Sequence, residues 1–328
     1  TSRDTASWTS LLAGYSHNGH HDEAIKCFKD MQCEGICPDS VTYLCILKAC
    51  GNAGSLEIGE RIGSDLRSQG LLEKNVALGN ALLEMYAKCG ALEKAQELFE
   101  WLPMRDALSW TSLIAGYTNL GLGDEALKCF RHMQNEGVLP DAVTYACVLK
   151  ACGIVGSLNI GEEIGDEVKN QGLLHTEIVL GTALIDMYAK CGELPKARGV
   201  FEELPVQNVV SWVALMSGYA QIGQANMVLE LYTKMRREGL DPNLVTFLVL
   251  INACSHGGLL EAGQKLFDEM QSIYGLVPTL DHYTCMIDLF GRAGHFDKAI
   301  KLLDEVQSLN HLELLLAILG ASCKWMNV

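Results

Sequence analysis

The chain has 328 residues, and its 25 basic and 40 acidic residues give a formal net charge of −15. Hydrophobic residues reach 49% and charged residues only 20%, which excludes an intrinsically disordered chain. No apolar run approaches the roughly 18 residues of a membrane span, and 13 cysteines, an odd number in a long chain, indicate free packing thiols and not a disulfide scaffold. The first five residues, TSRDT, resemble neither a signal peptide nor a transit peptide, so we expect a segment of a longer chain.

Several kinds of residue recur along the chain at a constant interval of 102 positions. The recurring sets are Trp8, Trp110 and Trp212; Gly19, Gly121 and Gly223; Pro38, Pro140 and Pro242; Cys50, Cys152 and Cys254; and Lys88, Lys190 and Arg292. Agreement between unrelated residue types in one register indicates an internal repeat, so the chain is not two ordinary globular domains.

Each block of 102 residues divides into three units of 35, 36 and 31 residues, and only the last unit is one residue longer. The units are 5–39, 40–75 and 76–106; 107–141, 142–177 and 178–208; and 209–243, 244–279 and 280–311, followed by a tail at 312–328. In the first unit, apolar residues fall at helical spacing in two segments. The segments contain Trp8, Leu11, Leu12 and Tyr15, and then Ala24, Ile25, Phe28 and Met31. Gly19 separates them, and Gly35 with Pro38 ends the second.

A single helical hairpin of this kind cannot bury its own apolar face, whereas stacked hairpins share a continuous core. The pattern therefore predicts an all-α fold, an α-solenoid of nine helix-turn-helix repeats.

The openings SWTSLIAGY, VTYACVLKACG and LGTALIDMYAKCG, in units of 35, 36 and 31 residues, resemble those of PLS-class pentatricopeptide repeat proteins. The resemblance covers almost the whole chain as three P-L-S triplets, and it implies a right-handed superhelix. The tail at 312–328, with LLLAILGASCKWMNV, is similar to the start of the extension motif that follows the last triplet in this class, cut short.

This resemblance implies sequence-specific binding of single-stranded RNA, one base per repeat, in plant mitochondria or chloroplasts. It also implies that the chain selects sites for C-to-U editing and recruits a deaminase, in trans or in a C-terminal domain. A small editing-cofactor protein is an implied partner, bound through the 36-residue L repeats. No metal, other cofactor or membrane partner is expected.

The family reads each base with the fifth and last residues of a repeat. Transferred to this sequence, the pairs are Thr9 with Asp39, Asn80 with Asp106, Thr111 with Asp141, Thr182 with Asn208, and Val213 with Asn243; in the last unit Thr284 pairs with either Asn310 or His311. The L units carry Leu44, Ala146 and Leu248 as fifth residues, which cannot hydrogen-bond to a base. The implied RNA word, from 5′ to 3′, is G, any, U, G, any, A, pyrimidine, any, purine.

The second residue of each unit packs against bases in the family. Ala6, Ala77, Leu108, Val179 and Val210 suit this apolar role, whereas Asp281 departs from it. Two structural roles compete with the reading roles. Thr, Asn and Asp at helix starts commonly cap the helix, and the recurring tryptophans, like the cysteines, suit core packing better than base stacking.

The acidic balance opposes RNA binding, because phosphate neutralisation usually dominates affinity for nucleic acid. Over the first fourteen residues of each unit, however, five basic residues stand against four acidic ones. Three of the basic residues, Lys88, Lys190 and Arg292, occupy the position where the family contacts phosphate. Glu84, Asp186 and Asp288 lie four residues earlier, so an i,i+4 ion pair is an equal alternative.

Catalysis is not expected from this sequence. The H-x-E motif His21-Asp22-Glu23 has no C-x-x-C motif to complete a deaminase zinc site, and no phosphate-binding G-K-[ST] motif is present. The alternative to RNA binding is a protein-interaction scaffold of the tetratricopeptide type, which the acidity and the scarcity of lysine on the first helices favour.

Overall fold

The computed structural model describes residues 4–307, and these residues form helices α1 to α20 and no strand. The tail at 312–328 and the candidate readers Asn310 and His311 lie outside the described residues. No helix among those described is long and apolar enough to cross a membrane. The chain divides into two compact units, residues 1–157 and 158–328, which we describe separately. From here on, the first and second unit are these two parts of the chain, and the segments of 31 to 36 residues are called repeats.

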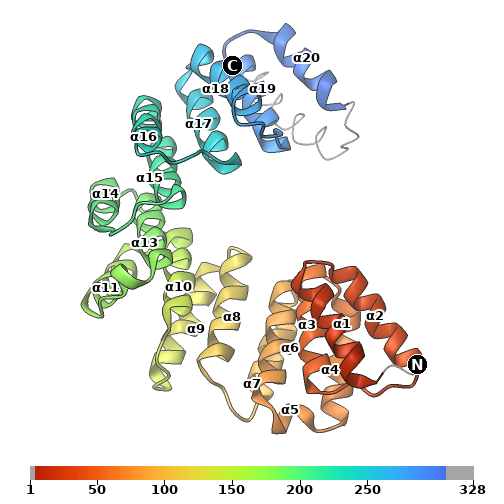
Figure 1. Cartoon of the computed structure of the whole chain (residues 1–328). Helices are drawn as coiled ribbons and strands as arrows, with labels where there is room; N and C mark the ends of the chain where they lie inside the picture. The colour runs from red at the N-terminus through yellow and green to blue at the C-terminus, as the bar shows by residue number, and fades with distance from the viewer. Residues whose placement is uncertain (1–3, 308–328) are drawn as a thin grey trace. The chain divides into compact units, whose positions relative to one another are not determined.

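The described residues of the first unit form helices α1 to α10 (Figure 1). They are α1 (Thr5–His17), α2 (His21–Cys33), α3 (Ser40–Ala53), α4 (Leu56–Ser68), α5 (Leu71–Lys74), α6 (Val76–Lys88), α7 (Leu92–Trp101), α8 (Ala107–Asn119), α9 (Gly123–Asn135) and α10 (Ala142–Val155).

The second unit continues the same alternation over its described residues. Its helices are α11 (Leu158–Asn170), α12 (Leu173–Thr176), α13 (Ile178–Lys190), α14 (Leu194–Glu203), α15 (Val209–Gln221), α16 (Ala225–Arg237), α17 (Leu244–Gly257), α18 (Leu260–Ser272), α19 (Leu280–Arg292) and α20 (Phe296–Gln307).

The helices stack in two kinds of row. In the first unit, α1, α3, α6, α8 and α10 pack successively against one another, and in the second unit α13, α15, α17 and α19 do the same. We call these the first helices, because each begins at the first residue of a repeat expected from the sequence. The second helices, such as α2, α7, α9 and α16, pack against their own first helix and against the next one along the chain. Each unit is therefore a solenoid of stacked hairpins, as predicted.

The sequence explains where the helices begin and end. Asp39 caps α3 by accepting a hydrogen bond from the Thr42 backbone N–H, and the Thr42 hydroxyl accepts one from the Asp39 backbone N–H in return. At the other end of hairpins, Gly19 and Gly35 adopt left-handed backbone conformations, which glycine enters without steric cost.

The core runs between the two rows of helices. Trp8, Trp110 and Trp212 are all buried, and Trp110 packs edge-on against Phe99 with ring centroids 4.5 Å apart. These contacts confirm the expected packing role of the tryptophans. Cys50, Cys152 and Cys254 are also buried, and burial raises the pKa of the Cys50 thiol to about 12.

Three details differ from the sequence-based expectations. Leu11, placed on the apolar stripe, is 39% exposed, because it lies at the margin of the α1 face that Trp8 and Leu12 bury. Cys33 and Cys37 are exposed and are not packing residues, since they flank the turn after α2. In addition, the repeats at 40–75 and 142–177 contain a third short helix, α5 and α12 respectively, where two helices were expected.

Candidate nucleic-acid interface

At most repeat boundaries the last residue of the repeat caps the next first helix, whereas Glu177 forms no side-chain cap hydrogen bond. Asp39, Asp106, Asp141, Asn208 and Asn243 each accept a hydrogen bond from a backbone N–H three residues later, at 2.7 to 2.9 Å. The capping role is thus confirmed for these five side chains. Capping occupies only one carboxylate oxygen of Asp39 and of Asp141. The bonds from Thr42 to Asp39 and from Thr144 to Asp141 all end on Oδ1, and both aspartates are exposed.

The fifth residue of the first repeat is joined to the last one through an intermediate hydroxyl. Thr9 Oγ1 lies 2.7 Å from Thr42 Oγ1, and the Thr42 hydroxyl donates to Asp39 Oδ1 at 2.8 Å. The fourth repeat has the same arrangement 102 residues later. Thr111 Oγ1 lies 2.6 Å from Thr144 Oγ1, which donates to Asp141 Oδ1 at 2.7 Å.

The third repeat joins its pair directly. The Asn80 amide donates from Nδ2 to both carboxylate oxygens of Asp106, at 3.0 and 3.2 Å. The Ser109 hydroxyl donates to Asn80 Oδ1 at 2.6 Å and also lies 3.0 Å from Asp106 Oδ1. The structure therefore brings together each predicted pair in the first unit.

Hydrogen bonds lower the pKa of two of these carboxyl groups. At Asp39 the Thr42 backbone N–H and then the Thr42 hydroxyl stabilise the carboxylate, so its pKa lies below the ordinary 3.8. At Asp106 burial alone would raise the pKa, but bonds from the Ser109 backbone and the Asn80 amide outweigh it, and the net shift is also downward. Both groups are ionised at neutral pH and act there as hydrogen-bond acceptors.

Among the described residues of the second unit, the pairs Thr182 with Asn208 and Val213 with Asn243 are not linked in this way. The Thr182 hydroxyl donates to the Ile178 carbonyl of its own helix at 3.1 Å, while Asn208 caps α15. Val213 has no polar atom to offer Asn243, and the Thr284 hydroxyl donates to the Leu280 carbonyl at 3.0 Å.

The second residues of the repeats form an exposed apolar series. The valines and leucine at these positions are between 53% and 66% exposed: Val41, Leu108, Val143, Val179, Val210 and Val245. Ala6 and Ala77 are exposed as well, and Asp281 interrupts the series. Sequence reasoning named Leu108, Val179 and Val210 but missed Val41, Val143 and Val245, although they stand at the same position of the 36-residue repeats.

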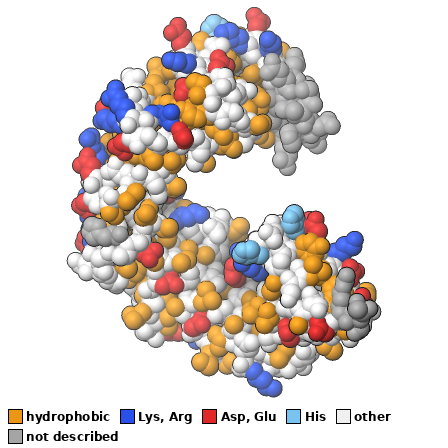
Figure 2. Space-filling model, in the orientation of Figure 1, with side chains coloured by type: hydrophobic (Ala, Val, Ile, Leu, Met, Phe, Trp, Pro, Cys, Tyr) orange, Lys and Arg blue, Asp and Glu red, His pale blue; other side chains and the backbone are white. Residues whose placement is uncertain are grey.

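The candidate phosphate-binding cations are engaged in ion pairs on their own helices. Lys88 lies 2.8 Å from Glu84, Lys190 lies 2.7 Å from Asp186, and Arg292 lies 2.8 Å from Asp288. Lys88 also donates to Asn52 Oδ1 on the neighbouring first helix at 3.0 Å. The i,i+4 pairing is confirmed, whereas phosphate contact stays a prediction. On the face drawn in Figure 2, basic side chains are interspersed with acidic ones.

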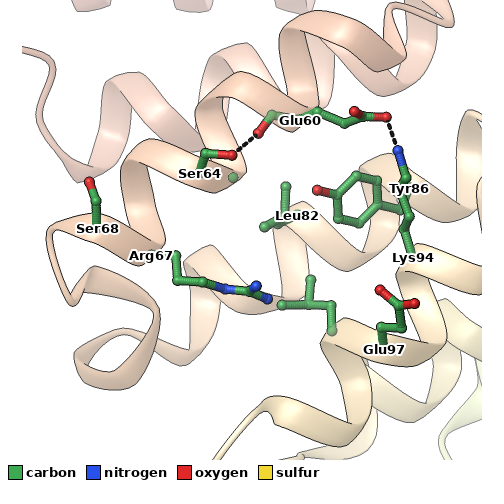
Figure 3. A pocket seen from close by; sticks show the side chains of 10 residues that line it. Glu60, Ser64, Arg67, Ser68, Leu82, Tyr86, Lys94 and Glu97 are labelled. Atoms are coloured by element: carbon green, nitrogen blue, oxygen red, sulfur yellow. Dashed lines mark hydrogen bonds and ion pairs between the residues drawn. The ribbon is translucent and has the colours of Figure 1, made fainter.

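A separate groove lies between the second helices α4 and α7 and the first helix α6 of the first unit. It has a volume of 460 Å³ and is lined by α4, α6 and α7 (Figure 3). Glu60 forms an ion pair with Lys94 across it, and Ser64 donates to the Glu60 carbonyl at 3.0 Å. Gly63 keeps the groove open over Tyr86, since an added Cβ would lie 3.0 Å from the phenol oxygen.

This groove recurs 102 residues later in the second unit, where Glu162 and Lys196 form the matching ion pair. In the third triplet Phe267 replaces the glycine and packs 5.6 Å from Tyr283. Neither groove contains a predicted reading residue. Among the described residues no group of His, Cys, Asp and Glu could hold a metal ion.

The fold and its interface define a class of protein, a helical-hairpin repeat protein in which several repeats carry a polar pair at the start of the first helix and at the end of the repeat. Family models described as "PPR repeat family" and "PPR repeat" match this chain, the former at residues 3–52, 105–153 and 207–256. Two models carry the description "PPR repeat". One matches residues 274–307, and the other matches residues 80–100, 182–209 and 245–273.

Curated relatives from Arabidopsis thaliana agree with these matches. Pentatricopeptide repeat-containing protein At2g33680 is 39% identical over 84% of this chain and 38% of its own length. The putative mitochondrial protein At3g13770 is 38% identical over 84% of this chain and 44% of its own length, and the chloroplastic protein At1g08070 is 38% identical over 77% and 34%. The chain therefore belongs to the pentatricopeptide repeat family, and it spans less than half the length of these relatives.

Solved structures show the same fold. The crystal structure of the pentatricopeptide repeat protein PPR10 in complex with an 18-nt psaJ RNA element superposes with a TM-score of 0.73 at 22% identity, covering 94% of this chain and 46% of that one. The structure of PPR10 from maize gives 0.63 at 23% identity, covering 96% and 45%.

Proposed function

We propose that this chain binds single-stranded RNA in a sequence-specific way, with one base per repeat. The observation that carries the proposal is the hydrogen-bonded reading pair of the first unit, present in three repeats at corresponding positions. A polar pair beside an exposed apolar second residue offers both the edge contact and the stacking contact that an unpaired base needs. The complex of PPR10 with RNA, a protein of the same fold, supports this direction.

In this proposal most base contacts come from the more exposed residue of each pair, the last residue of the repeat. Thr9, Asn80 and Thr111 are only 9%, 3% and 5% exposed, whereas Asp39, Asp106 and Asp141 are exposed. In this proposal the base edge meets the carboxylate and the outer side of the fifth residue. Val41, Leu108 and Val143, the exposed residues of neighbouring repeats, pack against the base faces.

The wider role we propose is selection of cytidines for C-to-U editing in mitochondria or chloroplasts, as the P-L-S order of the repeats suggests. The relatives named mitochondrial and chloroplastic are consistent with this address. A deaminase acting in trans or in a further domain would supply the chemistry. The L repeats, whose fifth residues are apolar, would bind a small editing-cofactor protein.

One gel-shift experiment tests the RNA proposal. The chain is titrated into an RNA carrying the word G, any, U, G, any, A, pyrimidine, any, purine, and into the same RNA with both G bases changed to A. We expect at least tenfold weaker binding to the altered RNA, given about 1–3 kcal/mol for each good base contact. Equal binding would overturn the base-reading proposal.

A protein-binding scaffold is the second candidate. The specific observations that favour it are the net charge of −15 and the ion-paired state of Lys88, Lys190 and Arg292. Absence of detectable binding to any RNA at low salt, where phosphate contacts are strongest, would support the scaffold instead.

A further inference from the structure

We propose that Thr42, Ser109 and Thr144, the third residues of the repeats that follow the reading pairs, are positioning residues that fix which atoms of each pair donate and which accept. The inference rests on the proposed function. It adds a residue that lies in the next repeat and is itself fully buried, so it acts through the readers and not on the base.

The single proton of the Thr42 hydroxyl decides the polarity of the first pair. That hydroxyl donates to the Asp39 carboxylate at 2.8 Å, the strongest acceptor within reach. It therefore cannot also donate to Thr9, 2.7 Å away, so the Thr9 hydroxyl must donate to Thr42. Thr9 Oγ1 then offers only its lone pairs to a base.

The fourth pair reaches the same result by either of two routes. If Thr144 donates to Asp141, the Thr111 hydroxyl donates to Thr144. If Thr144 donates to Thr111 instead, the Thr111 hydroxyl donates to the Ala107 carbonyl, 2.8 Å away. In both cases its proton is used inside the protein. Each Thr–Asp pair thus presents acceptors only, which matches the two adjacent donors, N1–H and N2–H, on the edge of guanine.

At the third pair, Ser109 fixes the orientation of the Asn80 amide. The Ser109 hydroxyl lies 2.6 Å from Asn80 Oδ1 and 3.0 Å from Asp106 Oδ1, and it donates along the shorter contact, so Nδ2 faces the Asp106 carboxylate. A reversed amide would place Oδ1 about 3 Å from a carboxylate oxygen, where two acceptors repel. One hydrogen of Nδ2 is shared by the two Asp106 oxygens, so the pair offers the other N–H as a donor beside the carboxylate acceptor, in a fixed order. Uracil presents the complementary order with O4 and N3–H, and cytosine presents the opposite order with N4–H and N3.

The second unit provides a natural contrast. Ser211 stands at the same repeat position as Ser109 and is equally buried, but its hydroxyl donates to the Asn208 backbone carbonyl at 2.9 Å and not to Thr182. Thr246 forms a capping box with Asn243 like those of Thr42 and Thr144, yet the fifth residue there is Val213, which has no polar atom.

The matched variants Ser109→Ala and Ser211→Ala test this inference. Each removes a buried hydroxyl at the same repeat position and leaves the backbone N–H that caps the helix. For each protein, Kd is measured by fluorescence anisotropy for two RNAs that differ only in U or C at the third base. The ratio of the two Kd values does not depend on the fraction of active protein, so a loss of stability does not change it.

We expect the wild-type chain and Ser211→Ala to prefer U over C by roughly tenfold, about 1.4 kcal/mol. Ser109→Ala should reduce that ratio to about twofold or less, and Ser109→Thr, which keeps the hydroxyl, should restore it. An unchanged ratio in Ser109→Ala, with the wild-type preference intact, would overturn this inference alone. No preference in the wild-type chain would overturn the proposed function as well.

Thr144→Val and Thr246→Val provide an independent pair of variants. Both lose the hydroxyl of a capping box, but only Thr144 contacts a polar fifth residue. Thr144→Val should lower the preference for G over A at the fourth base by roughly fivefold to tenfold, as loss of one well-placed contact implies, and Thr246→Val should leave it unchanged. Equal effects of the two variants would contradict a positioning role.

Discussion

The two units of this chain share one repeat pattern but differ in how their reading pairs are built. In the first unit each of the three polar pairs is held together by hydrogen bonds that involve a hydroxyl of the next repeat. This hydroxyl links the two residues in each Thr–Asp pair, and in the Asn80–Asp106 pair it contacts Asn80. In the second unit Thr182 and Thr284 donate to carbonyls of their own helices, and Val213 has no polar atom.

The contrast shows that residue identity alone does not determine a preorganised pair. Thr182 carries the same hydroxyl as Thr111, but the next repeat offers it no hydroxyl within reach, because the Ser211 side chain donates to a backbone carbonyl. A side chain whose position is already fixed loses less conformational entropy when it binds. We therefore expect the first unit to contribute most of the sequence specificity.

The largest expected effect comes from changing RNA bases that face the first unit. Replacing the base at position 1, 3 or 4 of the word should weaken binding by about tenfold each, since each removes a contact to a fixed pair. Replacing the base at position 6 or 7 should weaken it threefold or less. A competition gel shift with single-base variants measures both sets. Equal losses at all five positions would show that hydrogen-bonded preorganisation does not matter.

Building the missing pair in the second unit should sharpen specificity there. Val213→Thr places a hydroxyl opposite Thr246, whose capping box with Asn243 matches that of Thr144 with Asp141. We expect a preference for adenine of about fivefold at the seventh base, where a Thr–Asn pair resembles the adenine-reading pair, again within the range of a direct base contact. Val213→Ala, which adds no hydroxyl, is the control and should show no new preference.

Releasing a candidate phosphate-binding cation from its ion pair should change affinity without changing specificity. Asp186→Asn frees Lys190, which now lies 2.7 Å from Asp186. We expect RNA binding to tighten twofold to threefold, in line with the few tenths of a kcal/mol of such a pair, and the salt dependence of Kd to steepen. Anisotropy titrations between low and high salt measure both. If Lys190→Ala and Asp186→Asn leave Kd unchanged, the cation does not contact phosphate.

The smallest expected effect is on stability in acid. The pKa values of Asp39 and Asp106 are lowered in the folded chain, so their hydrogen bonds add stability above the unfolded-state pKa. That contribution is lost as the pH falls through the folded-state pKa, below the ordinary 3.8. Urea unfolding from pH 6 to pH 3 should show a shallower decline for the Asp39→Asn, Asp106→Asn double variant. A parallel decline would contradict the assigned shifts.

Much of the fold could be predicted from the sequence. The 102-residue interval is visible in Trp8, Trp110 and Trp212, because the core at these positions requires the same large side chain in each block. Glycines at hairpin turns and polar caps at helix starts marked the ends of the helices. The short helices α5 and α12 were not foreseen, since four-residue segments are too short to show a helical period.

The family resemblance named the candidate pairs, but the sequence did not indicate how their side chains are connected. Thr9, Asn80 and Asp106 were named in this way, whereas the role of Ser109 depends on which rotamer its hydroxyl adopts. Ser109 and Ser211 occupy equivalent positions and differ only through the neighbour they find, Asn80 or Thr182. The ion pairs of Lys88 and Lys190 were anticipated from i,i+4 spacing.

Photo-crosslinking tests most directly whether the reading pairs face the bases. An RNA carrying the predicted word, with 4-thiouridine as its third base, is irradiated in complex with the full chain, and the linked peptide is identified by mass spectrometry. We expect crosslinks to peptides that contain Ala77 and Asn80 of α6, or Asp106 and Leu108 at the start of α8. Crosslinks confined to the second helices α4, α7 and α9 would contradict it.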